Sequence, residues 1–153
     1  MIINVSIYQL VILYTHLKDK AKQYNFPSIL LFIIGFIDII RGFLHTFEVN
    51  WAAQTLAKLD LSVVKADQLT LLGAFGISNL LTGLLYILIS KKAKNLSPYV
   101  LAIIPVTYLI GFIGLKVSGI YSTAAFDGKY FMLVYLLVCA ITSGIFFFKM
   151  RRK

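Results

Sequence analysis

Charged residues are scarce in this chain. Asp, Glu, Lys and Arg together make up 14% of its 153 residues, and apolar residues make up 59%. A soluble domain has about 25% charged residues, and this composition cannot supply the polar coat that a soluble fold needs. The single cysteine, Cys139, excludes an internal disulfide framework. The composition predicts an all-α, polytopic integral membrane protein that forms one membrane domain over residues 1–153, with the lipid bilayer as its first partner.

Sequence motifs of known chemistry are also missing. The chain contains no Gly-x-Ser-x-Gly elbow, no His-Glu-x-x-His, no P-loop and no Cys-x-x-Cys. The two histidines, His16 and His45, are predicted at opposite depths, so we expect no metal site, no haem and no other cofactor. The net charge is +9. Nucleic-acid binding also needs a folded basic face with base-reading side chains, and the sequence indicates none, so we expect no nucleic-acid partner.

Long apolar runs define the predicted membrane spans. About 20 apolar residues cross a hydrocarbon core of about 30 Å. Three runs without Asp, Glu, Lys or Arg are long enough, and a fourth is interrupted only by a few polar residues; they cover residues 68–90, 95–115, 130–148 and 28–47. The run at residues 1–17 is shorter and more polar, so it either spans the bilayer or lies in the interface. We therefore expect a helix bundle with four core transmembrane helices and a short N-terminal helix.

Basic residues predict how the chain is oriented. Ten of the fifteen lie at the ends of spans that would share one side of the membrane. They are Lys18, Lys20, Lys22, Lys91, Lys92, Lys94, Lys149, Arg151, Arg152 and Lys153. The opposite loops hold four, mixed with acidic residues. Because cytoplasmic loops carry the excess of Lys and Arg, we expect a cell (inner) membrane protein with a cytoplasmic C-terminus.

A repeated tetrapeptide favours an internal duplication. Ile-Gly-Phe-Ile occurs at residues 34–37 and again at 110–113. Two duplicated helix hairpins, residues 27–94 and 98–153, would then be related by a pseudo-two-fold axis along the membrane normal. A chance match in an apolar sequence is the alternative, and both readings stay open.

Glycines recur within the predicted spans. Small residues let helix backbones approach closely in lipid, so most of these glycines are expected to serve helix packing. A glycine-lined ligand channel is the alternative. The glycines concerned are Gly35, Gly42, Gly73, Gly76, Gly83, Gly111, Gly114 and Gly144.

The most unusual feature is a charged stripe in the span at residues 28–47. Asp38, Arg41, His45 and Glu48 are spaced three, four and three residues apart, which places them on one face of a helix. Each neighbouring pair is within reach on adjacent turns. Asp38 is expected near the middle of the bilayer and Glu48 at its outer surface. Asn79 in the next span is the best polar partner at the depth of Asp38.

Charged groups inside a bilayer are costly, so they mark candidate functional sites. The first hypothesis is a small protein with a polar intramembrane cavity, lined by this stripe and Asn79, that binds or transports a small ligand or protons. Arg41 would anchor an anion, and Asp38 and His45 would titrate.

Two further hypotheses stay open. The second is a membrane enzyme acting on a lipid, sterol or quinone, with His45, Asp38 or Glu48 as the catalytic acid or base. The third is a structural or assembly subunit whose stripe is buried against another protein of a membrane complex. A homo-oligomer is compatible with all three. A stripe that only fixes the register of the helix is the purely structural alternative.

Overall fold

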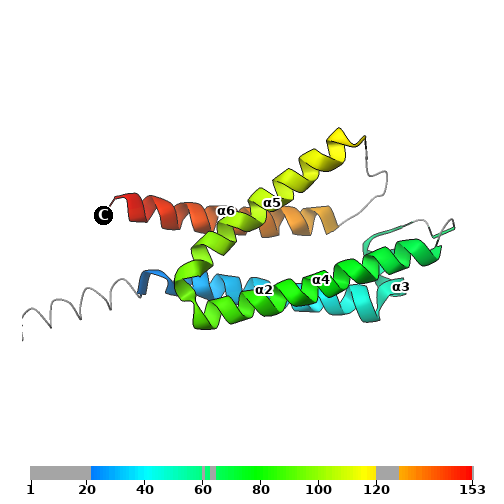
Figure 1. Ribbon diagram of the computed structural model, residues 1–153, viewed down its shortest axis with the longest axis horizontal. Helices are drawn as coiled ribbons and strands as arrows, with labels where there is room; N and C mark the ends of the chain where they lie inside the picture. The colour runs from blue at the N-terminus through cyan, green and yellow to red at the C-terminus, as the bar shows by residue number, and fades with distance from the viewer. Residues whose placement is uncertain (1–21, 60, 63–64, 120–127, 153) are drawn as a thin grey trace, which may run out of the picture.

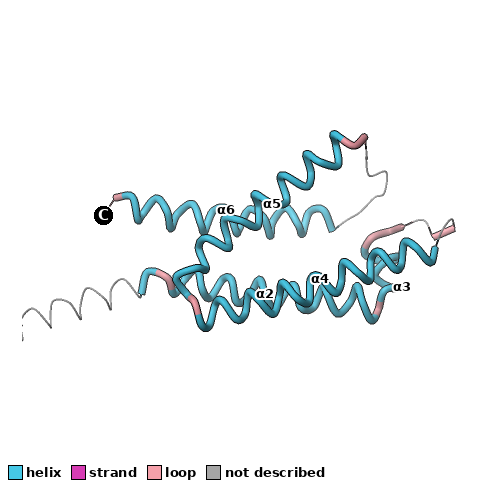
Figure 2. The backbone as a smooth tube through the Cα atoms, in the orientation of Figure 1, coloured by secondary structure: helices cyan, strands magenta, loops and turns pink. Residues whose placement is uncertain are grey.

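The computed structural model describes residues 22–59, 61–62, 65–119 and 128–152. This part of the chain is almost entirely helical and contains no strand (Figure 2). Four helices are long and apolar enough to cross a membrane: α2 (Asn25–Phe47), α4 (Lys65–Lys92), α5 (Ser97–Val117) and α6 (Gly128–Arg151). The predicted all-α bundle with four apolar spans is confirmed. The predicted N-terminal helix at residues 1–17 lies outside the described residues.

Short helical segments connect these spans. Beyond α2 the chain forms α3 (Val49–Trp51) and a π-helical turn, η1 (Ala52–Leu56). A 3-10 turn, η2 (Lys94–Leu96), joins α4 to α5. Pro27 and Pro98 lie in the first turns of α2 and α5, where the missing N–H has no intrahelical partner to lose. The four spans predicted from the apolar runs agree with α2, α4, α5 and α6 to within three residues at each end.

Helices α2 and α4 form a close antiparallel hairpin (Figure 1). Two glycines seven residues apart on each helix meet in opposite order, Gly35 against Gly83 and Gly42 against Gly76. A Cβ atom added at Gly35 would lie 2.8 Å from the carbonyl oxygen of Gly83, and one at Gly42 would lie 2.8 Å from that of Gly76. The two backbones touch at both positions, so these four glycines serve helix packing.

Helices α5 and α6 pack against this hairpin mainly at the end near η2 (Figure 1). Ser28 Oγ there donates a hydrogen bond to the carbonyl oxygen of Ser90, which joins α2 to the end of α4. A buried apolar cluster joins α2, α5 and α6; its members are Leu31, Ile34, Leu101, Ile104, Tyr135 and Cys139. Ile104 is the last buried residue of α5 and directly precedes Pro105. Beyond that point the residues of α5 are almost all exposed.

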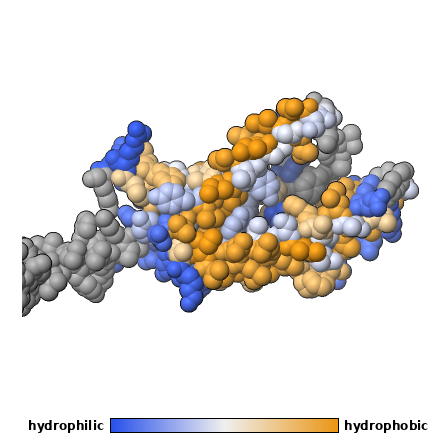
Figure 3. Space-filling view, viewed as in Figure 1, coloured by the Kyte–Doolittle hydropathy of each residue, from blue (hydrophilic) through white to orange (hydrophobic). Residues whose placement is uncertain are grey.

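The outer surface of the helices is apolar. Leu71 on α4, Ile110 on α5 and Phe26 on α2 are each more than 60% exposed. Hydrophobic residues cover the middle of the molecule, and hydrophilic ones gather toward its ends (Figure 3). Lipid is the solvent in which such a surface is stable, so the protein is embedded in a membrane.

Glycines of the two hairpins have different surroundings. Gly35 contacts α4, whereas its counterpart in the repeated tetrapeptide, Gly111, has nothing within 4 Å of an added Cβ. The proposed duplication of residues 27–94 and 98–153 stays a prediction.

Orientation can be tested by cysteine labelling from outside the cell. We expect a membrane-impermeant thiol reagent to modify Ala57→Cys and to leave Lys92→Cys unmodified, because the basic end of the bundle is predicted to be cytoplasmic. The native Cys139 is fully buried, so it should contribute no background. The opposite labelling pattern would overturn this orientation.

Candidate functional site

Asp38 is the buried centre of the charged stripe. It lies midway along α2 and is 4% exposed. Arg41, one turn further along the helix, donates from Nη1 to Oδ1 of Asp38 at 3.3 Å. Aspartate and arginine three residues apart share one helix face, so the spacing itself places these two groups together.

The second oxygen of Asp38 binds a residue of another helix. Tyr135 on α6 donates its hydroxyl to Oδ2 at 3.1 Å, and the tyrosine is 6% exposed. This bond links the α2–α4 hairpin to α6 at the border of the apolar cluster. Both carboxylate oxygens therefore have a donor, and Asp38 faces the interior of the bundle.

Arg41 and His45 share one aromatic neighbour on α4. The guanidinium carbon of Arg41 lies 5.8 Å from the ring centre of Phe75, and the imidazole of His45 lies 5.8 Å from the same ring. An arginine over an aromatic face gains a cation–π attraction. Phe75 thus holds both side chains against α4.

The outer end of the stripe lies at the surface. Glu48 directly follows α2, with backbone angles outside the helical region, and its side chain is exposed. The spacing predicted that each neighbouring pair of the stripe is within reach. Within the described residues, Asp38–Arg41 is the pair that forms an ion pair. Glu48 is therefore separated from the buried part of the stripe.

Asn79 brings an unpartnered donor to this site. The residue is 6% exposed, and its Nδ2 has no hydrogen-bond partner within the described part of the chain. The contacts of Gly35 with Gly83 and of Gly42 with Gly76 place Asn79 near the depth of Asp38. Asn79 also lies one turn from Phe75 on the same face of α4. A buried amide nitrogen without an acceptor is rare and calls for an explanation.

His45 carries a second unpartnered polar atom. Its Nδ1 is buried and has no hydrogen-bond partner among the described residues. The site therefore combines a part-buried ion pair with two polar atoms that have no partner among the described residues, Nδ2 of Asn79 and Nδ1 of His45.

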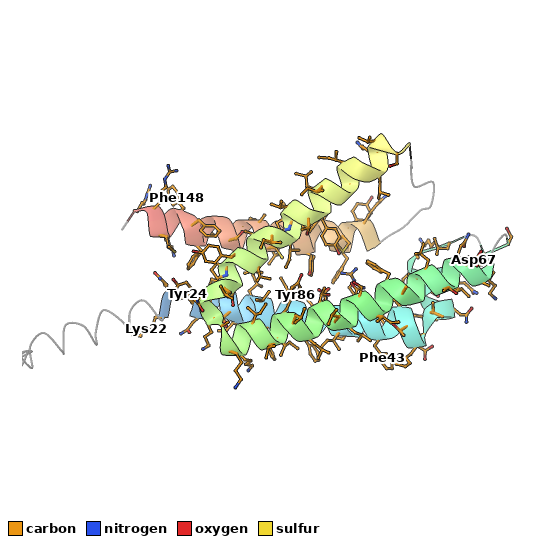
Figure 4. All side chains as sticks on the ribbon, viewed as in Figure 1. Lys22, Tyr24, Phe43, Asp67, Tyr86 and Phe148 are labelled. Carbon is orange, nitrogen blue, oxygen red and sulfur yellow. The ribbon has the colours of Figure 1, made fainter. Side chains whose placement is uncertain are left out.

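Several other polar residues of α4, α5 and α6 lie away from Asp38 or form hydrogen bonds within their own helices. Ser143 donates to the carbonyl of Cys139 within α6, and Thr82 donates to the carbonyl of Ser78 within α4. Tyr86 lies in the C-terminal half of α4 (Figure 4) and packs against the apolar cluster. Tyr108 instead lines a shallow hollow of about 590 Å³ on the open side of α5, with Thr107, Gly111, Phe112 and Leu115.

Metal ligands do not cluster in the described residues. No group of three His, Cys, Asp or Glu side chains there could hold a metal ion. His16, one of the two histidines, lies outside the described part of the chain.

Tyr135 is the site residue that the sequence analysis missed. It is the first member of a buried series on α6, followed by Cys139, Thr142 and Phe146 at spacings of four, three and four. That spacing is the period of one helix face. This face also contains the polar residue Thr142, so the series is the signal in the sequence that would have indicated Tyr135.

Removing the tyrosine hydroxyl should weaken the bundle. Tyr135→Phe keeps the ring but leaves Oδ2 of Asp38 without its donor, so we expect the free energy of unfolding to fall by about 1–3 kcal/mol. Titration with a denaturing detergent measures this. Tyr108→Phe is the matched control, because Tyr108 is 38% exposed; it should change stability by less than about 0.5 kcal/mol. Equal effects of the two variants would contradict a structural role for the Tyr135–Asp38 bond.

Comparison with protein-family models, with curated proteins and with solved structures found no match to this chain. The function must therefore be inferred from the site itself.

Proposed function

We propose that Asp38, Arg41, His45 and Asn79 form an intramembrane binding site for a small ligand, in a protein that binds or transports that ligand. The observation that carries this proposal is the amide nitrogen of Asn79, a residue that is 6% exposed. This nitrogen has no hydrogen-bond partner among the described residues and lies near the depth of the part-buried Asp38–Arg41 pair. Bundle cores satisfy their polar groups internally or with bound molecules. A ligand with hydrogen-bond acceptors would satisfy this one.

Access to the site favours binding over a sealed structural pair. The side chain of Arg41 is 17% exposed and that of Asp38 is 6% exposed. The arginine is therefore the more accessible member of the pair. An arginine has five N–H donors, and in the described structure one of them binds Asp38. The remaining donors are the groups to which we expect a ligand to bind.

The other two hypotheses receive less support. A subunit that buries its stripe against another protein would direct Asp38 out of the bundle, whereas Asp38 bonds to Tyr135 of the same chain. An enzyme would use His45, Asp38 or Glu48 on a reacting group. Asp38 already accepts two hydrogen bonds and Glu48 is exposed beyond α2. Of the three catalytic candidates, His45 is the one with a buried polar atom, Nδ1, that has no partner among the described residues.

Thermal unfolding of the purified protein tests the proposal. The protein is heated with a panel of small molecules: benzoate, acetate, phosphate, choline and glucose. At least one is expected to raise the melting temperature in a saturable manner, because a ligand at 100 times its Kd stabilises by about 2.7 kcal/mol. Asp38→Leu with Arg41→Leu should fold and lose this response. Gly111→Ala, far from the pair on open α5, should keep it.

Two outcomes would overturn the proposal. One is a melting temperature that none of the five molecules changes. The other is a double variant that responds to the active molecule as strongly as the native chain does.

A further inference from the structure

The buried charges of the site balance when nothing is bound. Asp38 and Arg41 form an ion pair and cancel each other. Glu48, the other acid of the stripe, is exposed and separated from them. With His45 neutral the buried part of the stripe therefore carries no net charge.

The free hydrogen-bonding groups favour a negatively charged ligand. Arg41 and the unpartnered Nδ2 of Asn79 are donors, whereas both oxygens of Asp38 already accept bonds. An anion at these donors would bring one uncompensated charge into the bilayer, which is costly. A second positive charge is needed at the same place.

His45 is the residue positioned to supply that charge. It packs on the same Phe75 ring as Arg41, and its Nδ1 is buried without a partner. Histidine is the side chain that changes charge between about pH 5 and pH 8. Protonation of His45 from the outer solvent would restore electroneutrality when an anion binds.

We propose that the ligand is a monocarboxylate bound together with one proton, with the carboxylate on Arg41 and Asn79 and the proton on His45. This rests on the proposed function and names the ligand class of the same site. The bound state contains Asp38 and the ligand carboxylate as anions, and Arg41 and His45 as cations, so the charges balance. A carboxylate matches the planar fork of a guanidinium. Phosphate carries about two negative charges, one more than the site can balance.

On its own helix His45 has two charged neighbours: Arg41, one turn before it, and the exposed Glu48, one turn after it. The α4 residues in contact with His45, Phe75 and Gly76, have no charge. The nearest charges on α4, Lys65 and Asp67, lie in its first turn, at least eight residues from Phe75. Lys129 and Tyr130 open α6 at the same end of the bundle.

Calorimetric titration of benzoate into the full-length protein in lipid nanodiscs tests the proposal. Titration in two buffers of different ionisation enthalpy measures the protons taken up, and we expect about one per benzoate when the experiment starts with His45 neutral. The affinity should fall about tenfold per pH unit over this range. Benzamide, the neutral analogue, should not compete.

Three variants test which residues bind the proton and which bind the carboxylate. His45→Gln should bind benzoate more weakly, with no proton uptake and no dependence on pH. Asn79→Ala should weaken binding and keep the proton uptake. Arg41→Lys should weaken binding, because a point charge does not reproduce the guanidinium fork.

Three results would overturn the ligand assignment. They are that neither benzoate nor acetate binds, that benzoate binds without proton uptake, or that proton uptake persists in His45→Gln. The proposed function fails separately. If choline or glucose binds to the native chain but not to the Asp38→Leu, Arg41→Leu double variant, the site stands and the monocarboxylate is wrong. If no molecule of the panel binds, both proposals fail.

Discussion

Replacing Asp38 with leucine while Arg41 stays is expected to lower the free energy of unfolding by about 3–5 kcal/mol. Arginine cannot lose its proton in a protein, so Arg41 would remain charged inside the bundle without its counter-ion. The hydroxyl of Tyr135 would also lose its acceptor. Titration with a denaturing detergent, followed by loss of helical circular dichroism, measures the effect.

The double variant is the control for this result. Asp38→Leu with Arg41→Leu removes both charges, and exchanging a buried ion pair for apolar residues is often neutral. We therefore expect most of the lost stability to return. A double variant as unstable as Asp38→Leu alone would show that the isolated charge of Arg41 is not the cause.

Gly83→Leu is expected to disrupt the α2–α4 hairpin. A Cβ atom at Gly83 would lie 2.6 Å from the carbonyl oxygen of Gly35 and 2.8 Å from Cγ1 of Ile39. A backbone oxygen cannot move aside without moving α2, so the helices must separate. We expect a loss of about 3 kcal/mol in the same titration, at the upper end of the usual cost of overpacking.

Gly111→Leu is the matched substitution on α5. Nothing lies within 4 Å of an added Cβ at Gly111, so the change in stability should stay within about 0.5 kcal/mol. Equal losses at Gly83 and Gly111 would mean that the cost comes from glycine itself and not from helix contact.

The sequence predicts the spans well because the cost that limits each span acts on single residues. A charged residue in contact with lipid is costly wherever it occurs, so the ends of uncharged runs mark the ends of helices. The Asp38–Arg41 pair is predictable for the same reason, since one helix fixes the spacing of both residues.

Contacts between helices depend on how each helix is rotated about its axis, and the sequence contains less information on this rotation than on the ends of the spans. Residues on every side of α6 are apolar, so composition alone does not show that Tyr135 points inward. The glycines illustrate the same limit. Gly35 and Gly111 occupy identical tetrapeptides, yet only the first of these two touches another backbone. The repeated sequence contains no information on which copy has a partner.

Accessibility of Asn79 to a water-soluble reagent tests the central claim most directly, because a binding site must be reachable and a sealed structural pair need not be. In a Cys139→Ser background, an anionic thiol reagent is added from outside to Asn79→Cys and, as a control, to Ser90→Cys. Ser90 lies on the same helix, near its end at η2, and is 2% exposed. Its carbonyl oxygen accepts a hydrogen bond from Ser28. We expect that Asn79→Cys is modified, that benzoate slows the reaction, and that Ser90→Cys is not modified. An Asn79→Cys variant that stays unmodified, while Ala57→Cys reacts with the same reagent, would contradict it.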